Sequence, residues 1–335
     1  MKRINNLFEQ IISLDNLRLA DEKARKGKLR SYGVRKHDRN RDNNIISLHE
    51  KLKSGIYKTS NYHVFKMITD KGKEREIYQL PYFPDRIVHH AIMNIMEPVW
   101  MKVFTSNTYS CIKGRGIHGV VRKLKNDLKD YSNTRYCLKM DIRKFYPSID
   151  HEILKKILRK KIKDKRLLKL LDEIIESAPG VPIGNYLSQF FANLFLSYFD
   201  HWLKEIKHVK YYYRYADDMV ILSNNKKELH SLRSEIQQYL SKLKLTLKGD
   251  YQVFPVDSRG IDFVGYVFRH SHILLRKSIK KSFVRKAIKL QKQNLSEKEY
   301  NMQLSAYTGW TKHCNSINLQ NKLSYEKGRI RQKAA

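Results

Sequence analysis

The sequence predicts an α+β fold built from two or three packed units, on three observations. The chain has 335 residues, and domains usually contain roughly 100–200 residues. Apolar residues recur at helical spacing in several segments, whereas β-forming runs bounded by turns indicate antiparallel hairpins in others. Hydrophobic residues make up 41% of the chain, which is enough for packed cores and excludes a disordered basic tail.

The charge predicts a polyanionic partner. The chain has 67 Lys and Arg against 33 Asp and Glu, a formal net charge of +34. Residues 276–335 hold 15 of the basic and only 3 of the acidic residues. No run approaches the ~18 apolar residues of a membrane span, and three scattered cysteines form no C-x-x-C pair. We therefore expect a soluble, intracellular protein with no membrane partner, zinc ribbon or disulfide framework.

The N-terminal third predicts helices followed by a hairpin. Residues 1–60 show helical spacing, interrupted by a basic run at 21–42 that predicts an exposed connection. Residues 62–80 alternate around a turn at 70–72, which predicts a hairpin. Three cations lie near its tip: Lys71, Lys73 and Arg75.

The next segment predicts a long helix. Asp85 occupies a possible N-cap position before residues 86–100. The apolar stripe of this helix consists of Ile87, Ala91, Ile92, Ile95 and Met96. The glycines at 114–119 lack the spacing and the GK[ST] sequence of a P-loop, which disfavours a nucleotide-binding loop of that kind.

The remaining elements alternate between helix and strand. In chain order the patterns predict a helix to about 130, a strand at 136–142, a basic helical stretch at 150–176, a loop at 180–185, an apolar helix at 187–206, a hairpin at 210–223, a helix at 226–244, strands at 261–268 and basic C-terminal helices. No Pro- or Ser-rich linker separates these elements, so the joints between units should be compact.

Three carboxylates stand at the ends of apolar β-like runs. Asp141 ends one run, and Asp217 and Asp218 occupy the tip of the hairpin. On adjacent antiparallel strands they would form a like-charged cluster that divalent cations stabilise. Two Mg²⁺ ions held in this way are the arrangement that catalyses in-line phosphoryl transfer. The alternative is that Asp217 and Asp218 are ordinary turn residues.

An ordered set of motifs resembles those of the reverse transcriptases. LKMDIRKFYPSID, GVPIGNYLSQ, YRYADD and FVGY follow each other as the palm motifs do. EREIYQLPYFPDRIVHHAI and YSCIKGRGIHGVV resemble the fingers of the bacterial group, so the resemblance runs from about residue 60 to 270. VPIGNYLSQ and GWTKHCNSINL resemble the enzymes of diversity-generating retroelements, whereas YADD is shared with retron and intron enzymes.

The resemblance implies a right-hand polymerase with N-terminal helices and fingers at 1–135, a palm at 136–268 and a basic helical thumb at 269–335. It implies RNA-templated DNA synthesis from dNTPs with two Mg²⁺ ions, for which Mn²⁺ can substitute. The expected partners are template RNA and the RNA/DNA hybrid, and the expected location is the cytoplasm of a bacterial or phage-infected cell. For the retroelement subfamily it adds adenine-mutagenised cDNA and a small basic accessory protein.

The resemblance also implies roles for individual residues. The catalytic positions are Asp141, Asp217 and Asp218, and the metal-binding positions are these three together with Ile142. The dNTP-binding positions are Lys71, Lys73, Arg75, Tyr146, Gln189 and Lys248, with Tyr146 under the incoming sugar. The template and fidelity positions are Ile183, Gly184, Ser188 and Gln189. The primer grip consists of Phe263, Gly265 and Tyr266.

Several alternatives stay open. Phe145 and Tyr146 are alternatively core aromatics, and Lys71, Lys73 and Arg75 a solvated hairpin tip. The tyrosines at 211–213 and 215 could stack on nucleic acid, although strand alternation turns about half of them to the core. For the whole chain, one alternative is a retron-type, group II intron-like or abortive-infection defence polymerase. Another is a maturase-like RNA-binding scaffold without catalysis, which would have no use for a carboxylate cluster.

Overall fold

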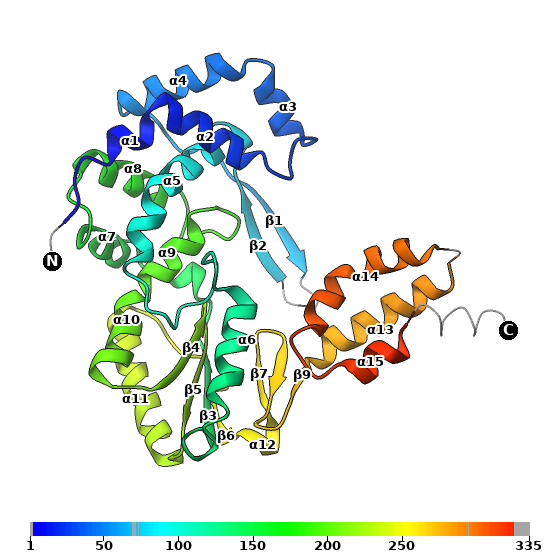
Figure 1. The fold of residues 1–335 in the computed structure, drawn as a ribbon. Coiled ribbons are helices and arrows are strands. Elements are labelled where there is room, and N and C mark those ends of the chain that lie inside the picture. The colour runs from blue at the N-terminus through cyan, green and yellow to red at the C-terminus, as the bar shows by residue number, and fades with distance from the viewer. Residues whose placement is uncertain (1–2, 69–71, 73, 294, 325–335) are drawn as a thin grey trace. The chain divides into compact units, whose positions relative to one another are not determined.

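The computed structural model describes residues 3–68, 72, 74–293 and 295–324 (Figure 1). Across these residues it contains helices and three antiparallel sheets, which confirms the predicted α+β class. The chain forms two compact units whose segments alternate along the sequence. Unit 1 comprises Met1–Cys111, Ile142–His208 and Gln237–Leu247, and unit 2 comprises Ile112–Asp141, Val209–Ile236 and Lys248–Ala335.

Unit 1 begins with the helices α1 (Phe8–Ile12), α2 (Leu14–Ala24), α3 (Tyr32–Asp38) and α4 (Arg41–Lys53). The helices α1 and α2 pack against α5 (Ile87–Met101). The basic run at 21–42 is largely exposed, as predicted, but it is not only a connection, because it contains the end of α2 and all of α3. Its Asp21 is fully buried and accepts hydrogen bonds from Arg25 (2.7 Å) and Arg41 (2.6 Å).

The predicted hairpin of unit 1 is present. The strands β1 (His63–Ile68) and β2 (Glu74–Gln79) pair antiparallel, while Lys71 and Lys73 lie outside the described residues. The predicted N-cap role of Asp85 is wrong. This residue lies in η1 (Tyr82–Arg86), where its buried carboxylate accepts from the Tyr57 hydroxyl (2.7 Å) and the Ser60 N–H (3.1 Å). Of the predicted stripe on α5 only Ile95 is not fully buried.

The rest of unit 1 is helical. It comprises η3 (Tyr146–Ser148), α7 (His151–Arg159), α8 (Lys165–Glu176), α9 (Ser188–Phe195), α10 (Ser197–His201) and η4 (Trp202–Ile206). The basic stretch at 150–176 divides into two helices because Asp164 begins a new one. Its carboxylate accepts from the main-chain N–H groups of Arg166 and Leu167, both at 3.1 Å.

Unit 2 is built on a sheet with the strand order β4-β5-β3-β6. Its strands are β3 (Tyr136–Asp141), β4 (Tyr211–Tyr215), β5 (Asp218–Ser223) and β6 (Gln252–Pro255). The helix α6 (Gly116–Asp127) packs against β4 (Figure 1), with η2 (Tyr131–Asn133) following it. The helix α11 (Lys226–Lys242) follows β5, and α12 (Val256–Arg259) follows β6.

A second sheet and three helices complete unit 2. The strands β7 (Ile261–Phe263), β8 (Tyr266–Phe268) and β9 (Ile273–Leu275) form an antiparallel sheet. The helices are α13 (Lys277–Gln291), α14 (Glu297–Thr311) and α15 (Ile317–Lys322). They share a core of their own, formed by Phe283, Ala287, Leu290, Tyr300 and Leu304.

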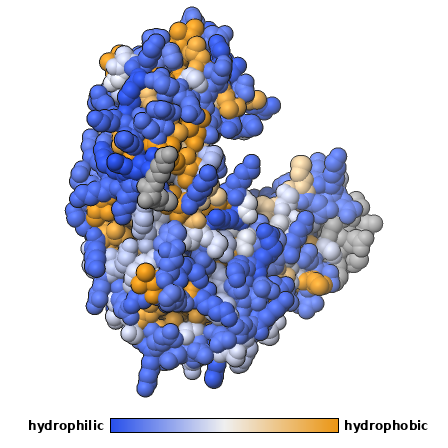
Figure 2. Space-filling model, turned by 60° about the vertical axis from the view of Figure 1, so that its left-hand side comes forward, coloured by the Kyte–Doolittle hydropathy of each residue, from blue (hydrophilic) through white to orange (hydrophobic). Residues whose placement is uncertain are grey.

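The surface is largely hydrophilic, in line with a composition that contains 30% charged residues. Hydrophilic residues cover most of the face shown in Figure 2, and apolar residues appear there only in separate patches. Among the helices that the structure describes, none combines the length and the apolar character needed to cross a membrane.

Candidate functional site

The sheet of unit 2 brings the three predicted carboxylates together at one end of its two central strands, β3 and β5. The strands β3 and β5 pair antiparallel with Asp141 opposite Asp218. Tyr215 pairs with Asp218 across β4 and β5, so Ala216 and Asp217 form a two-residue turn. Ala216 has a φ of 56°, a left-handed conformation that residues with a Cβ seldom adopt. This tight turn holds Asp217 directly before the strand that carries Asp218.

Two oxygens of this carboxylate cluster are buried without a hydrogen-bond partner. They are Oδ1 of Asp141 and Oδ1 of Asp218. Burial raises the pKa of Asp218 to about 7, against the opposing charge of Lys139. Burial and then the negative charge of Asp141 also raise the pKa of Asp217. The nearby positive charge therefore does not offset the burial of these two carboxyls, and both resist ionisation.

These properties fit a divalent cation that prefers oxygen ligands, such as Mg²⁺. Buried carboxylate oxygens that accept no hydrogen bond are suitable ligands for such an ion. Ile142 follows Asp141 in the chain, and its side chain is fully buried, so only its main-chain carbonyl could serve as a ligand. Within the described part of the chain, no group of three or more His, Cys, Asp or Glu side chains is arranged so that it could hold a metal ion by itself. Water and substrate phosphates would therefore supply the remaining ligands.

Lys248 is part of the cluster. Its main-chain N–H donates to the Asp141 carbonyl (2.8 Å), and its ammonium group forms an ion pair with the Asp141 carboxylate. The main-chain hydrogen bond and the ion pair thus join Asp141 and Lys248, which are 107 positions apart in the sequence. A cation bound to Asp141 would compete with Lys248 for this carboxylate.

Sequence reasoning missed Lys139, Asp262 and Arg276. Lys139 donates a hydrogen bond to the Asp262 carbonyl, and the Asp262 carboxylate accepts from Arg276 (2.5 Å). The charge of Lys139 opposes the rise in the pKa of Asp218. The signal for Lys139 was present, because residues two apart on a strand share a face. The link to residues 262 and 276 has no comparable signal in the sequence.

The predicted template and fidelity residues form a loop and helix start in unit 1. The Tyr78 N–H donates to the Ile183 carbonyl (2.8 Å) and ties the loop to β2. Gly184 has a φ of +125°, and a Cβ there would clash with the Tyr78 carbonyl oxygen, so only glycine fits. Ser188 is buried and donates to the Pro182 carbonyl (2.6 Å), whereas Gln189 is exposed. Ser188 therefore shapes the loop, and Gln189 is accessible.

The two aromatic residues after Asp141 differ in burial. Phe145 is buried, whereas Tyr146 is half-buried at the start of η3. Their rings form a T-shaped pair with centroids 5.5 Å apart. The expectation that one of the two belongs to the core is confirmed for Phe145. Of the predicted hairpin cations, only Arg75 is described, and it is exposed on β2.

The three residues of the predicted primer grip are all buried. Phe263 and Tyr266 are fully buried, and the Tyr266 hydroxyl donates to the Trp310 carbonyl (3.0 Å). Gly265 has a φ of +91°, and a Cβ there would lie 2.5 Å from the Trp310 ring. Of residues 263–266, only Val264 is partly exposed.

The prediction that half of the hairpin tyrosines face outward is wrong. Tyr211, Tyr212 and Tyr213 are all buried, and only Tyr215 is partly exposed. The hydroxyls of Tyr211 and Tyr213 donate to the carboxylates of Asp130 and Asp127. Asp127 is the last residue of α6, which packs against β4, and Asp130 follows this helix. The three buried rings therefore cannot stack on nucleic acid.

Comparison with known proteins agrees with this architecture. The sequence profile described as reverse transcriptase (RNA-dependent DNA polymerase) matches residues 57–268. Protein YkfC of Escherichia coli strain K12 is 28% identical over 276 residues, which covers 69% of this chain and 71% of that protein. The Retron Ec73 reverse transcriptase of Escherichia coli is 27% identical over 262 residues, which covers 72% and 79%.

A solved structure shows the same fold. The apo telomerase of Candida tropicalis matches with a TM-score of 0.53 at 13% identity over 73% of this chain. The present chain spans about half of that chain, 52%. This likeness concerns the fold alone and, together with the profile match, confirms the predicted right-hand polymerase. The profile covers well over half of the sequence. The chain therefore belongs to the reverse transcriptase family, the RNA-dependent DNA polymerases.

Proposed function

We propose that this chain copies an RNA template into DNA at the cluster of Asp141, Asp217 and Asp218. The observation that carries the proposal is the pairing of Asp141 with Asp218, which places two buried oxygens without hydrogen-bond partners at one end of β3 and β5. Asp141 and Asp217 would hold two Mg²⁺ ions, with Asp218 and the Ile142 carbonyl in support. When bound, the ions activate the primer hydroxyl and stabilise the leaving oxygen of the dNTP. Mn²⁺ would substitute for Mg²⁺.

The other predicted residues would orient the substrates around this cluster. Lys248 holds a proton on Nζ beside Asp141 and can give it to the departing pyrophosphate. Tyr146 would exclude a ribose 2′-hydroxyl, and Arg75, Lys71 and Lys73 would contact the triphosphate. Fingers at 1–135, a palm at 136–268 and a thumb at 269–335 would hold the template RNA and the RNA/DNA hybrid. We propose the cytoplasm of a bacterial or phage-infected cell as the location.

The proposed metal site makes stability depend on pH. Without Mg²⁺, the protein should lose stability as the pH rises from about 4 to about 7, because the pKa of Asp218 is raised from 3.8 to about 7 in the folded state. Mg²⁺ binds the ionised carboxylates, so it should stabilise the protein at pH 8 and much less at pH 5. A hundredfold excess over the dissociation constant would add about 2.7 kcal/mol. Thermal unfolding at both pH values, with and without Mg²⁺, measures this.

The control for this experiment is the Asp217→Asn/Asp218→Asn double variant, in which the difference between pH 5 and pH 8 should disappear. Equal stabilisation of the wild type by Mg²⁺ at pH 5 and pH 8 would show that the ion binds elsewhere. The readout is a midpoint of unfolding, so it does not depend on enzymatic activity.

Within the family, we propose the diversity-generating subfamily on the basis of the loop at 181–189. In this subfamily the product would be adenine-mutagenised cDNA, and a small basic accessory protein would bind the enzyme. The loop leaves Gln189 exposed and Ile183 half-buried, so both could contact a templating base. The second candidate is a retron-type enzyme, favoured by the similarity to the Retron Ec73 reverse transcriptase and by the YADD sequence.

Sequencing of cDNA made from a defined RNA separates these candidates. We expect errors mainly opposite template adenines, and we expect Gln189→Pro or Ile183→Asn to change their frequency without abolishing extension. A change of about 1.4 kcal/mol in one contact alters the error rate about tenfold. Gln189 lies in the first turn of α9, where proline is tolerated.

The matched control is Ile56→Asn, since Ile56 is 66% exposed and far from the loop in sequence. It should leave the error spectrum unchanged. Equally low errors at all four template bases in the wild type would reject the diversity-generating assignment, keep the polymerase activity and favour the retron-type enzyme.

A further inference from the structure

Gly180 and Val181, at the start of the loop at 180–185, contact the main chain of Tyr146. The Val181 N–H donates to the Tyr146 carbonyl (2.9 Å). Gly180 has a φ of +60°, and a Cβ at this position would lie 2.6 Å from the carbonyl oxygens of both Tyr146 and Pro147. Real Cβ atoms do not approach oxygen this closely. The main chain of Gly180 therefore packs directly on that of Tyr146, and no side chain fits between them.

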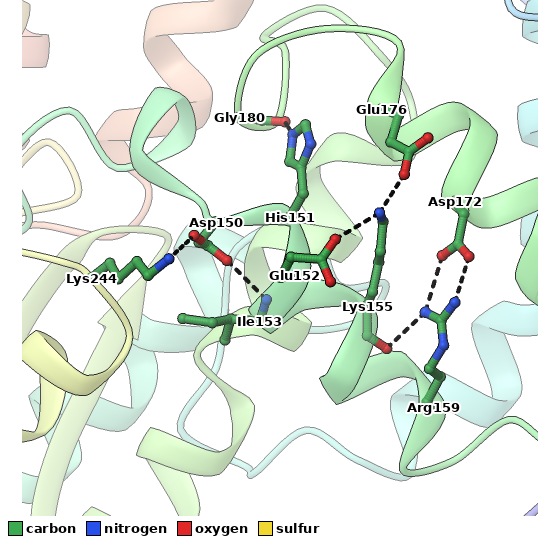
Figure 3. Close-up of polar contacts among 10 residues, drawn as sticks. All are labelled: Asp150, His151, Glu152, Ile153, Lys155, Arg159, Asp172, Glu176, Gly180 and Lys244. Carbon is green, nitrogen blue, oxygen red and sulfur yellow. Dashed lines mark hydrogen bonds and ion pairs between the residues drawn. The ribbon is translucent and has the colours of Figure 1, made fainter.

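The position of Gly180 is itself fixed by His151. The His151 Nε2 lies 2.7 Å from the Gly180 carbonyl oxygen (Figure 3). A carbonyl only accepts, so Nε2 carries the proton in this contact. His151 is the first residue of α7, and Asp150 caps this helix by accepting from the Ile153 N–H (3.0 Å). Asp150 also pairs with Lys244 at 2.5 Å (Figure 3), which holds the start of the helix in place.

The opposite side of Tyr146 is fixed as well. The Arg143 N–H donates to the Thr246 carbonyl (2.8 Å), and Phe145 is buried in the core. The main chain around Tyr146 is thus held by a neighbouring segment, by the core and by Gly180. All of these residues belong to unit 1. The ring of Tyr146 is half-buried and packs edge-on against the buried ring of Phe145, so this main-chain support and the ring pair act together on its position.

We propose that Gly180 and His151 are positioning residues that hold Tyr146 where it excludes ribonucleotides. The inference rests on the proposed role of Tyr146 under the incoming sugar. A methyl group at residue 180 must move from 2.6 Å to at least 3.4 Å from two carbonyl oxygens to reach an ordinary contact. Such a shift would displace the main chain of Tyr146 or the loop and would alter the gap that a 2′-hydroxyl must enter.

Gly180→Ala is the first test. We expect the ratio of kcat/KM for dNTP over rNTP incorporation to fall at least about tenfold, with the change mainly in the KM for the rNTP. The matched control is Gly27→Ala. Gly27 has a φ of +71° with nothing within 4 Å of a Cβ, so this variant carries similar backbone strain without the contact. It should keep the wild-type ratio.

His151 supplies a test that leaves the glycine in place. His151→Ala removes the hydrogen bond to the Gly180 carbonyl and should lower the ratio by about threefold. His151→Gln retains a side-chain N–H donor of similar reach and should restore most of the ratio. If Gly180→Ala does not fold, His151→Ala and His151→Gln still test the positioning role, because neither variant requires an unusual backbone conformation.

Tyr146→Ala, measured in parallel, separates the two ways in which the inference can fail. If Tyr146→Ala lowers the ratio whereas folded Gly180→Ala and His151→Ala both keep it, Tyr146 excludes ribonucleotides without support from Gly180 and His151, and the positioning role is wrong. If Tyr146→Ala itself keeps the ratio, the proposed role of Tyr146 fails, and the inference fails with it. A fall in all three variants, with recovery in His151→Gln, supports the inference.

Discussion

Replacing Asp217 and Asp218 together by asparagine should lower dNTP incorporation on an RNA template by about 10³-fold or more, while RNA affinity changes little. Asparagine has nearly the same size as aspartate but no charge, so the variant cannot balance the charge of bound cations. RNA binding depends instead on many dispersed Lys and Arg residues, of which the chain has 67 in all. Primer extension and filter binding, measured in parallel, test both parts of this expectation.

The same variant has a second readout in its stability. Burial raises the pKa of both carboxyls, so their ionised forms destabilise the metal-free protein at neutral pH. We expect the double variant without Mg²⁺ to unfold at a higher temperature than the wild type at pH 8 and at a similar temperature at pH 5. The control is Asp15→Asn/Asp42→Asn, because both of these residues are exposed. Extension at the wild-type rate by Asp217→Asn/Asp218→Asn would reject the proposed catalytic site.

Neutralising four lysines of α13 should weaken RNA binding and reduce its dependence on salt. The apolar face of α13 is fixed in the core that it shares with α14, through Phe283, Ala287 and Leu290. This packing leaves Lys277, Lys280, Lys281 and Lys289 exposed. If each contacts a phosphate, their replacement by glutamine should reduce the slope of log K against log salt by about 3 to 4. Glutamine and lysine have similar helix propensities, so α13 should remain folded.

A second quadruple variant controls for total charge. Lys26 and Lys28 between α2 and α3 and Lys51 and Lys53 at the end of α4 are also exposed, and their replacement by glutamine removes the same charge from the N-terminal region. Affinity titrated over a range of salt concentrations should change far less in this variant than in the α13 variant. An unchanged slope for the α13 variant would exclude this helix from the RNA-binding surface, and an equal fall in both would mean that only net charge matters.

The sequence by itself determined the local elements and the candidate carboxylates. The hairpin that carries Asp217 and Asp218 could be predicted because strand alternation and turn chemistry are properties of neighbouring residues. The same holds for the hairpin of β1 and β2 and for the helices of residues 1–60. These patterns depend on separations of a few positions, so they require no knowledge of the rest of the chain.

Tertiary structure decided which of these residues meet. The register that places Asp141 opposite Asp218, the ion pair of Asp141 with Lys248 and the packing of Gly180 on Tyr146 all join distant segments. The wrong predictions have the same origin. In sequence, Asp85 has the position of a helix cap, but in the fold its carboxylate accepts hydrogen bonds from Tyr57 and Ser60 instead. Strand alternation likewise does not show that Tyr211 is buried and donates to Asp130. Burial is a property of the whole fold, because the partner that covers a side chain is seldom its neighbour in sequence.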